Sequence, residues 1–266
     1  MQPLTISLIQ SNLYWEDKEK NLQQFSTKIA SLPKETQVVV LPEMFSTGFS
    51  MKPEQLAETM DGPTVQWMKD ISRQQRKIIT GSIILEEEGK YYNRLIWMLP
   101  NGTFYHYDKR HLFAFAGEDE HYTAGEKRLI VQVNGWKICL QVCYDLRFPV
   151  WSRQKSQPES EDSSGLYDIL IYVANWPQRR SHPWKTLLMA RAIENQCYVI
   201  GVNRVGEDGN GIYHSGDSTI ADPVGELIWQ QADDEATFTY TFLPEQLQEI
   251  RAHFPFLNDA DNFMLL

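Results

Sequence analysis

The chain has 266 residues, of which 42% are hydrophobic and 23% are charged, and its formal net charge is -10. Such a composition is typical of a globular protein that buries a sizeable core, and the length favours one large α/β domain. The acidic balance argues against nucleic acid or an anionic membrane as the main partner, because both bind basic surfaces.

The first 20 residues lack the basic region of a secretory signal and soon turn acidic, and no apolar run approaches the roughly 20 residues that span a bilayer. We therefore expect a soluble, cytoplasmic protein with no membrane partner. The three cysteines, Cys139, Cys143 and Cys197, form no C-x-x-C pair, so neither a disulfide framework nor a zinc ribbon is indicated.

The first elements of the chain alternate strand and helix. Residues 4–10 are predicted to form a short buried strand, and residues 16–31 a helix with apolar side chains at helical spacing. The β-branched run at 38–40 predicts a central strand covered on both faces. Pro42 ends that strand because it has no N–H to donate, which leaves Glu43 just past the strand's end.

A second helix and two hairpins follow. Pro63 opens the predicted helix over residues 63–76, at the first-turn position that proline favours, and a strand over 78–85 comes next. Two Asn-Gly pairs then predict hairpins with two-residue loops. Asn101-Gly102 joins strands at 90–100 and 103–109, and Asn134-Gly135 joins strands at 128–133 and 136–142.

The last third of the chain returns to alternating elements. Residues 156–165 are polar and predict an exposed loop. A strand over 168–174, a helix over 181–196 and a strand over 197–203 are expected after it, with a turn at Asp222-Pro223 between the final strands. Helix-then-strand units interleaved with hairpins favour an α/β architecture, with helices on the outer faces of a mixed sheet.

Cys143 is the candidate nucleophile. It follows the apolar strand ICLQV and precedes the polar segment YDLRFP, so its thiol is predicted to face a cleft at a strand end. Near neutral pH a thiol of ordinary pKa needs a partner base. None of the six histidines has a distinctive context, whereas Glu43 supplies a carboxylate at the end of a central strand.

Lys109 is the third candidate, because a fixed positive charge beside a thiol favours the thiolate and neutralises an oxyanion. Taken alone, each of the three residues also has an ordinary interpretation: a small buried thiol, a loop carboxylate and a solvated lysine. Cys139 and Cys197 lie inside apolar runs and are predicted to be core residues.

Three segments occur together in a fixed order: LPEMFSTGF at 41–49, YDKRHLF at 107–113 and CYDLRFP at 143–149. They resemble the three signature blocks of the carbon-nitrogen hydrolase, or nitrilase, superfamily, and most closely those of its omega-amidase branch. The resemblance covers essentially the whole chain. It implies a four-layer α-β-β-α sandwich with mixed sheets, formed by residues 1–266 as a single domain.

The resemblance also implies a Glu-Lys-Cys triad of Glu43, Lys109 and Cys143. In these roles Glu43 accepts the thiol proton, Cys143 attacks the amide carbon, and Lys109 forms the oxyanion hole with the backbone N–H of Tyr144. No metal or organic cofactor is needed for this chemistry.

Family members carry a second glutamate that hydrogen-bonds the lysine and orients the site. The matching segment is AGEDEHYTAG, in which Glu118 has the expected spacing and Glu120 is the alternative. Phe115, Tyr144 and Trp176 are expected to line the substrate pocket.

Arg147 lies four residues past the nucleophile and is expected to bind a substrate carboxylate through a bidentate contact. An ion pair with Asp145 or another acid is the alternative for this side chain. Arg179 and Arg180 are further candidates for the carboxylate.

The omega-amidase resemblance implies hydrolysis of the terminal carboxamide of a short dicarboxylate monoamide, such as 2-oxoglutaramate or succinamate, through a cysteine thioester. The partners are then a small amide and water. A nitrilase or N-carbamoyl amino acid hydrolase is the catalytic alternative, and a binding protein on the same scaffold the non-enzymatic one. The family implies a homodimer, with residues of about 250–266 as an arm, unless this apolar end packs on its own domain.

Overall fold

Two mixed β-sheets make up the centre of the protein. The computed structural model describes residues 1–154, 167–261 and 263. The predicted loop at 156–165 lies outside these residues, as do residues 262 and 264–266 of the C-terminal segment that was expected to form an arm.

The first sheet has six strands in the order β13-β1-β2-β3-β4-β5. β1, β2 and β3 run parallel to one another, and the other pairs are antiparallel. β1 and β13 pair along the full length of β1, from Leu4 opposite Phe242 to Gln10 opposite Ala236. The strands are β1 (Leu4–Gln10), β2 (Val38–Val40), β3 (Ile78–Glu87), β4 (Lys90–Met98), β5 (Phe104–Asp108) and β13 (Ala236–Phe242).

The second sheet has the order β10-β11-β9-β8-β7-β6, with β12 paired to β11. β7, β8 and β9 are parallel neighbours at its centre, and the remaining pairs are antiparallel. The strands are β6 (Leu129–Val133), β7 (Trp136–Val142), β8 (Ile169–Ala174), β9 (Tyr198–Asn203), β10 (Val205–Glu207), β11 (Tyr213–Ala221) and β12 (Leu227–Ala232).

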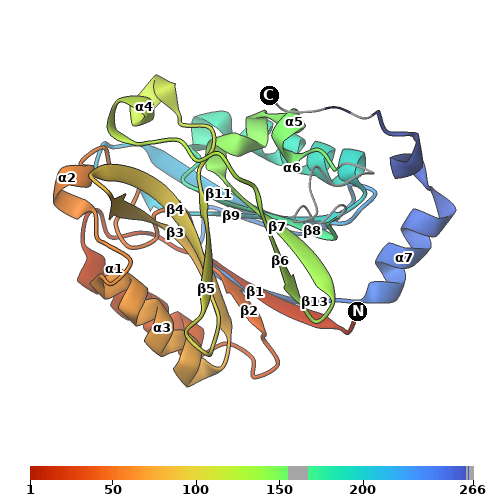
Figure 1. The fold of residues 1–266 in the computed structure, drawn as a ribbon, viewed down its shortest axis with the longest axis horizontal. Helices are drawn as coiled ribbons and strands as arrows, with labels where there is room; N and C mark the ends of the chain where they lie inside the picture. Colours follow the sequence, from red (N-terminus) through yellow and green to blue (C-terminus); the bar gives the residue numbers. More distant parts are fainter. Residues whose placement is uncertain (155–166, 262, 264–266) are drawn as a thin grey trace.

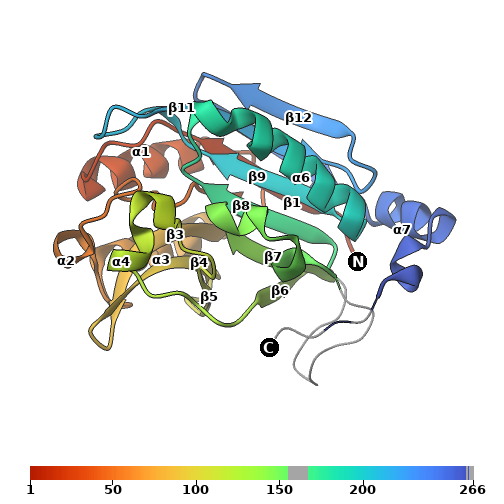
Figure 2. The ribbon, with the colours of Figure 1, turned by 90° about the horizontal axis from the view of Figure 1, so that it is seen from above.

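Helices cover the outer faces of the two sheets, with the sheets face to face between them (Figure 1). On the first sheet, Val39 of β2 packs in one apolar cluster with Phe25 and Met68 of the helices. Its neighbours Val38 and Val40 belong to the core shared with the second sheet, because side chains alternate along a strand. Figure 2 shows α6 (Ser181–Asn195), the long helix of the other layer, lying over β9 and β11 of the second sheet. These layers confirm the predicted α-β-β-α architecture. The helices are α1 (Lys18–Ala30), α2 (Pro53–Leu56), α3 (Pro63–Gln75), α4 (Glu118–His121), α5 (Pro149–Ser152), α6 (Ser181–Asn195) and α7 (Pro244–His253).

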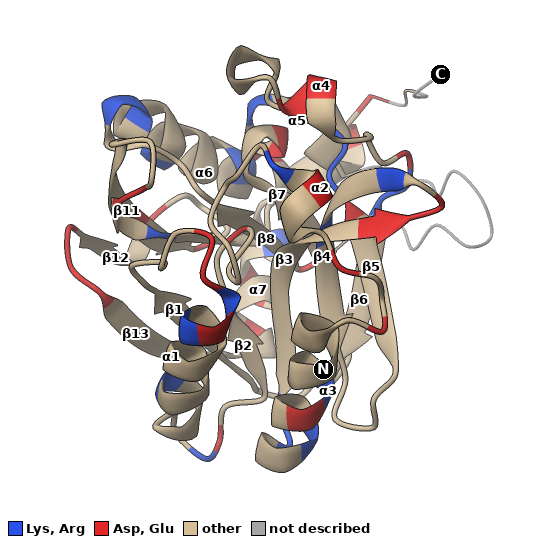
Figure 3. Cartoon of the chain, turned by 90° about the vertical axis from the view of Figure 1, so that its left-hand side faces the viewer, with Lys and Arg blue, Asp and Glu red and all other residues tan. Residues whose placement is uncertain are grey.

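The helix starts follow from capping. α1 begins at Lys18 instead of residue 16, because the Asp17 side chain accepts a hydrogen bond from the backbone N–H of Lys20 and so caps the helix. α3 begins at Pro63, as predicted. Both helices carry charges of both signs (Figure 3). No helix in the described ranges is long and apolar enough to cross a membrane.

The prediction for the first hairpin was wrong in its loop. Leu99 donates its N–H to the carbonyl of Thr103, which leaves a three-residue loop. The N–H of Gly102 also bonds to the carbonyl of Leu99, and Gly102 has φ 86°. The turn therefore runs from Leu99 to Gly102, with Pro100 and its fixed φ in the second position, one residue earlier than the Asn-Gly pair suggests.

The second hairpin does have the predicted two-residue loop. Val133 and Trp136 are paired, and Asn134 and Gly135 both have positive φ, at 52° and 85°. This conformation matches the type I′ turn that an Asn-Gly pair favours. The hairpin leads directly into β7, and Cys143 follows the last residue of that strand.

Candidate active site

The predicted catalytic residues all follow the carboxyl ends of strands. Glu43 lies three residues past β2, Lys109 directly follows β5, and Cys143 directly follows β7. β2 and β3 are parallel, and β5 runs in the same direction because two antiparallel pairings separate it from β3. The strand ends therefore meet at one edge of the sandwich, where α/β proteins place their ligand sites.

Cys143 occupies a strained elbow. β7 stops at Val142, and Cys143 begins a 3₁₀ turn, Cys143–Arg147, with φ 44°. Cys143 therefore follows the strand that carries Cys139, as predicted from the segment ICLQV. A non-glycine residue in this left-handed region costs about 1–3 kcal/mol, and such strain gathers at functional sites. Cys139 and Cys197 are fully buried in the core, as predicted.

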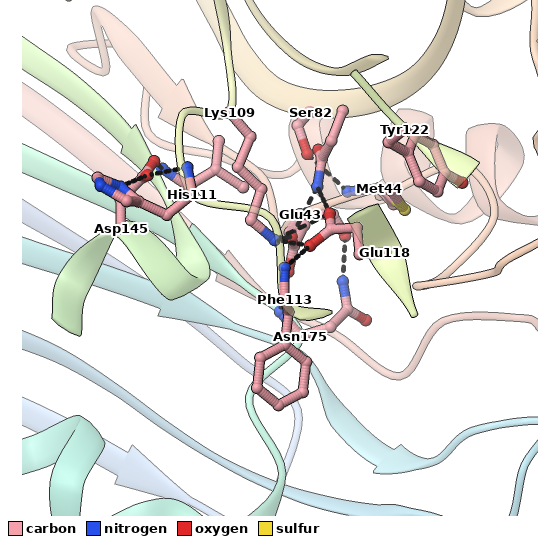
Figure 4. Close-up of polar contacts among 12 residues, drawn as sticks. Glu43, Met44, Ser82, Lys109, His111, Phe113, Glu118, Tyr122, Asp145 and Asn175 are labelled. Atoms are coloured by element: carbon pink, nitrogen blue, oxygen red, sulfur yellow. Dashed lines mark hydrogen bonds and ion pairs between the residues drawn. The ribbon is translucent and has the colours of Figure 1, made fainter. Parts of the chain in front are cut away.

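Lys109 lies between two buried carboxylates (Figure 4). Its Nζ is 3.0 Å from Oε1 of Glu43, and 3.0 Å and 2.8 Å from the two oxygens of Glu118. All three side chains are sealed from solvent. Glu120, the alternative second glutamate, is exposed. Two acids around one amine leave the cluster with an excess negative charge beside Cys143.

The electrostatics keep the lysine charged and the thiol neutral. Burial opposes the charge on Lys109, but Glu118 and Glu43 outweigh it and raise the pKa of the amine above its usual range. Burial first, and then the negative charge of Glu43, raise the pKa of the Cys143 thiol well above its ordinary value, against the opposing effect of Lys109. The expected stabilisation of a thiolate by Lys109 is thus outweighed, and the resting thiol needs a base.

The Glu43 carboxylate is held by two asparagines that the sequence analysis missed. Asn93 of β4 donates from Nδ2 to Oε1 of Glu43 at 2.8 Å and to Glu118 at 3.2 Å. The backbone N–H of Asn175 donates to Oε2 of Glu43 at 2.7 Å. Asn175 directly follows β8, so its place at a third strand end was the signal that could have identified it. Asn93 lies within a strand and gave no such signal.

Asp145 ties the elbow of Cys143 to the loop of Lys109. Its carboxylate accepts hydrogen bonds from the Tyr107 hydroxyl at 2.7 Å, the Val142 N–H at 3.0 Å and the backbone N–H of His111 at 3.0 Å. His111 Nδ1 lies 2.8 Å from the same carboxylate, and its ring stacks on Phe148. The view that no histidine has a distinctive context was therefore wrong for His111.

Replacing Asp145 with asparagine is expected to lower the free energy of unfolding by about 2–3 kcal/mol, because an amide NH₂ then faces buried donors. Urea unfolding followed by circular dichroism measures this change. Asp119→Asn, at an exposed carboxylate of α4, is the matched control and should change stability by less than about 0.5 kcal/mol. Equal losses of unfolding free energy in the two variants would show that Asp145 does not hold the elbow of Cys143 against the loop of Lys109.

A pocket of about 390 Å³ opens over Cys143 and Lys109. That volume suits a small molecule. Tyr144, Arg147 and Trp176 line it, as expected of them, and Phe115 lies at its rim with 80% of its surface exposed. His214, which sequence analysis left unassigned, is buried in the wall, and burial lowers its pKa to about 4.

The two interpretations of Arg147 can now be compared. Its guanidinium lies over the ring of Trp176, 4.9 Å from the ring centre. The partners of Asp145 are those given above, so the alternative of an Arg147–Asp145 ion pair was wrong. The part of the chain described by the structure holds no group of three or more His, Cys, Asp or Glu side chains arranged for a metal ion.

Comparisons with known proteins give one consistent family. The sequence model described as carbon-nitrogen hydrolase matches residues 5–252. An omega-amidase of Yersinia enterocolitica is 44% identical over 269 residues, with both chains covered completely. A 2-oxoglutaramate amidase of Bacillus subtilis is 29% identical over 96% of each chain. The crystal structure of a carbon-nitrogen hydrolase superfamily protein from Xanthomonas campestris, with an arsenic adduct in its active site, has a TM-score of 0.95 and 43% identity, again over both complete chains.

Proposed function

The chain belongs to the carbon-nitrogen hydrolase family, and on that premise we propose that it hydrolyses the terminal carboxamide of a short dicarboxylate monoamide. 2-Oxoglutaramate and succinamate are substrates of this class, and the products are the dicarboxylate and ammonia. One observation carries the proposal: the pocket over Cys143 and Lys109 has, in its wall, the guanidinium of Arg147 with no described carboxylate partner. Full-length similarity to an omega-amidase and to a 2-oxoglutaramate amidase supports the same substrate class.

In the first half of the proposed reaction, Glu43 removes the proton of the Cys143 thiol as sulfur attacks the amide carbon. The new C–S bond pushes the carbonyl electrons onto oxygen. Lys109 and the backbone N–H of Tyr144 stabilise that oxyanion. When the oxyanion collapses, the C–N bond breaks and Glu43 passes the proton to the departing ammonia, which leaves an acyl thioester on Cys143.

In the second half, Glu43 accepts a proton from water as the water oxygen attacks the thioester carbon. A second oxyanion forms at the same site and collapses with cleavage of the C–S bond. Glu43 returns the proton to the sulfur, and the dicarboxylate leaves. The three hydrogen bonds from Lys109, Asn93 and Asn175 suit Glu43 to this role, because they fix its carboxylate while it cycles between two proton states.

The substrate class can be tested with three compounds that share a carboxylate and differ at the reacting end. We expect succinamate to release ammonia with a kcat/KM about 100-fold or more above that of 3-cyanopropanoate and N-carbamoylglycine. The nitrile has no amide N–H or carbonyl oxygen for the site, and the carbamoyl group is less electrophilic. A coupled glutamate dehydrogenase assay measures the ammonia.

Turnover of 3-cyanopropanoate with succinamate untouched would identify a nitrilase. Turnover of N-carbamoylglycine alone would identify a carbamoyl hydrolase. If none of the three compounds, nor 2-oxoglutaramate, releases ammonia, the dicarboxylate monoamide assignment fails.

A further inference from the structure

Arg180 is a second arginine of the pocket that has no carboxylate partner among the described residues. Arg180 is half-buried and lines the pocket together with Arg147. Other shielded arginines are paired, for example Arg94 with Asp108 at 2.7 Å and Arg251 with Asp168 at 2.8 Å. Among the described residues, no acid lies within ion-pair distance of Arg147 or Arg180.

The one carboxylate in the wall of the pocket outside the lysine cluster is already occupied. Asp208 accepts hydrogen bonds from the backbone N–H groups of Asn210 at 2.8 Å and Ile212 at 3.0 Å. Asp208 therefore stabilises its own loop and does not pair with the guanidinium of Arg147 or Arg180.

Both guanidiniums rest on aromatic rings that the fold fixes in place. Arg180 lies over Phe113 with 5.0 Å to the ring centre, and Arg147 lies over Trp176. Trp176 also donates from Nε1 to the carbonyl of Arg180 at 2.7 Å, so the ring under one arginine anchors the backbone of the other. A cation held over a ring face is preorganised, because less side-chain freedom is lost when an anion binds.

The two arginines come from different elements that line the pocket together with Cys143. Arg147 ends the 3₁₀ turn that Cys143 begins, and Arg180 ends a second such turn, Gln178–Arg180, just before α6. The ring of Phe113 under Arg180 makes an edge contact with Tyr144, 4.9 Å between centres. Burial and the like charges of Arg179 and Arg147 lower the pKa of Arg180, so an anion between them would relieve this repulsion.

We propose that Arg180 is a specificity-determining residue that binds, together with Arg147, the free carboxylate of the substrate. The inference rests on the proposed function and deepens it: the site selects linear monoamides whose far end carries one negative charge. Two guanidiniums offer paired N–H donors to the two carboxylate oxygens, which a neutral end group cannot use.

The test compares succinamate with butyramide, in which a methyl group replaces the carboxylate. In Arg180→Gln we expect kcat/KM for succinamate to fall between about 10-fold and 100-fold, because a charged hydrogen bond is lost. The kcat/KM for butyramide should stay within about threefold of wild type. Arg180→Lys should recover part of the succinamate activity, since lysine keeps the charge but not the fork.

Arg73→Gln is the matched control, because it removes the same charge from an exposed position of α3 outside the pocket, whereas Arg179 itself lines the pocket. It should change the succinamate to butyramide ratio by less than about threefold. If Arg180→Gln leaves the ratio of kcat/KM for succinamate to kcat/KM for butyramide at its wild-type value, the two-arginine site is overturned while the proposed function stands. If the wild type itself does not prefer succinamate, the proposed function fails, and this inference fails with it.

Discussion

Cys143→Ala is expected to abolish ammonia release from succinamate, lowering kcat by about 10⁴-fold or more. Alanine keeps the elbow and the pocket but removes the only atom that can form the acyl intermediate. The fold should survive, because the substitution deletes one sulfur at the floor of an open pocket. Steady-state ammonia release measures kcat, and thermal unfolding monitors the fold.

The other thiols supply the controls for this experiment. Cys197→Ala removes a fully buried thiol far from the pocket and should leave kcat within about threefold of wild type. Iodoacetamide should add one carboxamidomethyl group to the wild type and none to Cys143→Ala, because Cys139 and Cys197 are sealed in the core. Retention of more than a few per cent of kcat by Cys143→Ala would refute a thioester at this residue.

Lys109→Met is expected to reduce both activity and stability. Glu43 and Glu118 would then face each other without a cation in a site closed to water, which costs about 3–5 kcal/mol of unfolding free energy. The loss of an oxyanion donor should lower kcat by about 10²-fold to 10³-fold. Urea unfolding and succinamate hydrolysis measure the two effects separately.

The same substitution should shift the pH profile of the residual activity to higher pH. Burial raises the pKa of Glu118 above its usual range, Lys109 opposes this rise, and Glu43 adds to it. Without the lysine, the two carboxylates are expected to hold a shared proton up to a higher pH, so Glu43 becomes an effective base only there. An unchanged pH profile would show that the lysine does not set the charge state of the base.

The double variant Lys109→Met/Glu118→Gln separates charge balance from catalysis. Removing one carboxylate should recover much of the lost stability, because a single buried acid with hydrogen-bond donors remains. Activity should stay low, since the oxyanion still lacks its cation. Recovery of activity along with stability would mean that Lys109 acts only as a structural counter-ion.

Sequence alone predicted the features that depend on local chemistry. The β-branched run at Val38–Val40 predicted a central strand, and Pro42 placed Glu43 just past the end of that strand. The turn at Asn134-Gly135 has two residue types that adopt positive φ readily, as this turn requires. Three signature segments then predicted which acid, amine and thiol would be candidates.

What the sequence did not predict depends on contacts between distant segments. Asn93 of β4 meets Glu43, which follows β2, across the intervening strand β3, and nothing in its own neighbourhood distinguishes it from any polar strand residue. That no described carboxylate pairs with Arg180 is likewise a property of its surroundings, because it follows from the positions of Asp208 and the other acids in the fold. The displaced loop of the first hairpin shows the same limit on a smaller scale, since Pro100 outcompetes the pair that follows it.

The pairing of β1 with β13 has a consequence for how the chain reaches this structure. The second strand of that ladder lies more than 220 residues beyond the first, from Ala236 to Phe242 against Leu4 to Gln10. During synthesis the backbone N–H and C=O groups on one edge of β1 therefore stay unpaired until residues 236–242 have left the ribosome. Closure of that edge is a late event in folding, and until then the exposed edge is a point at which nascent chains could pair wrongly with each other.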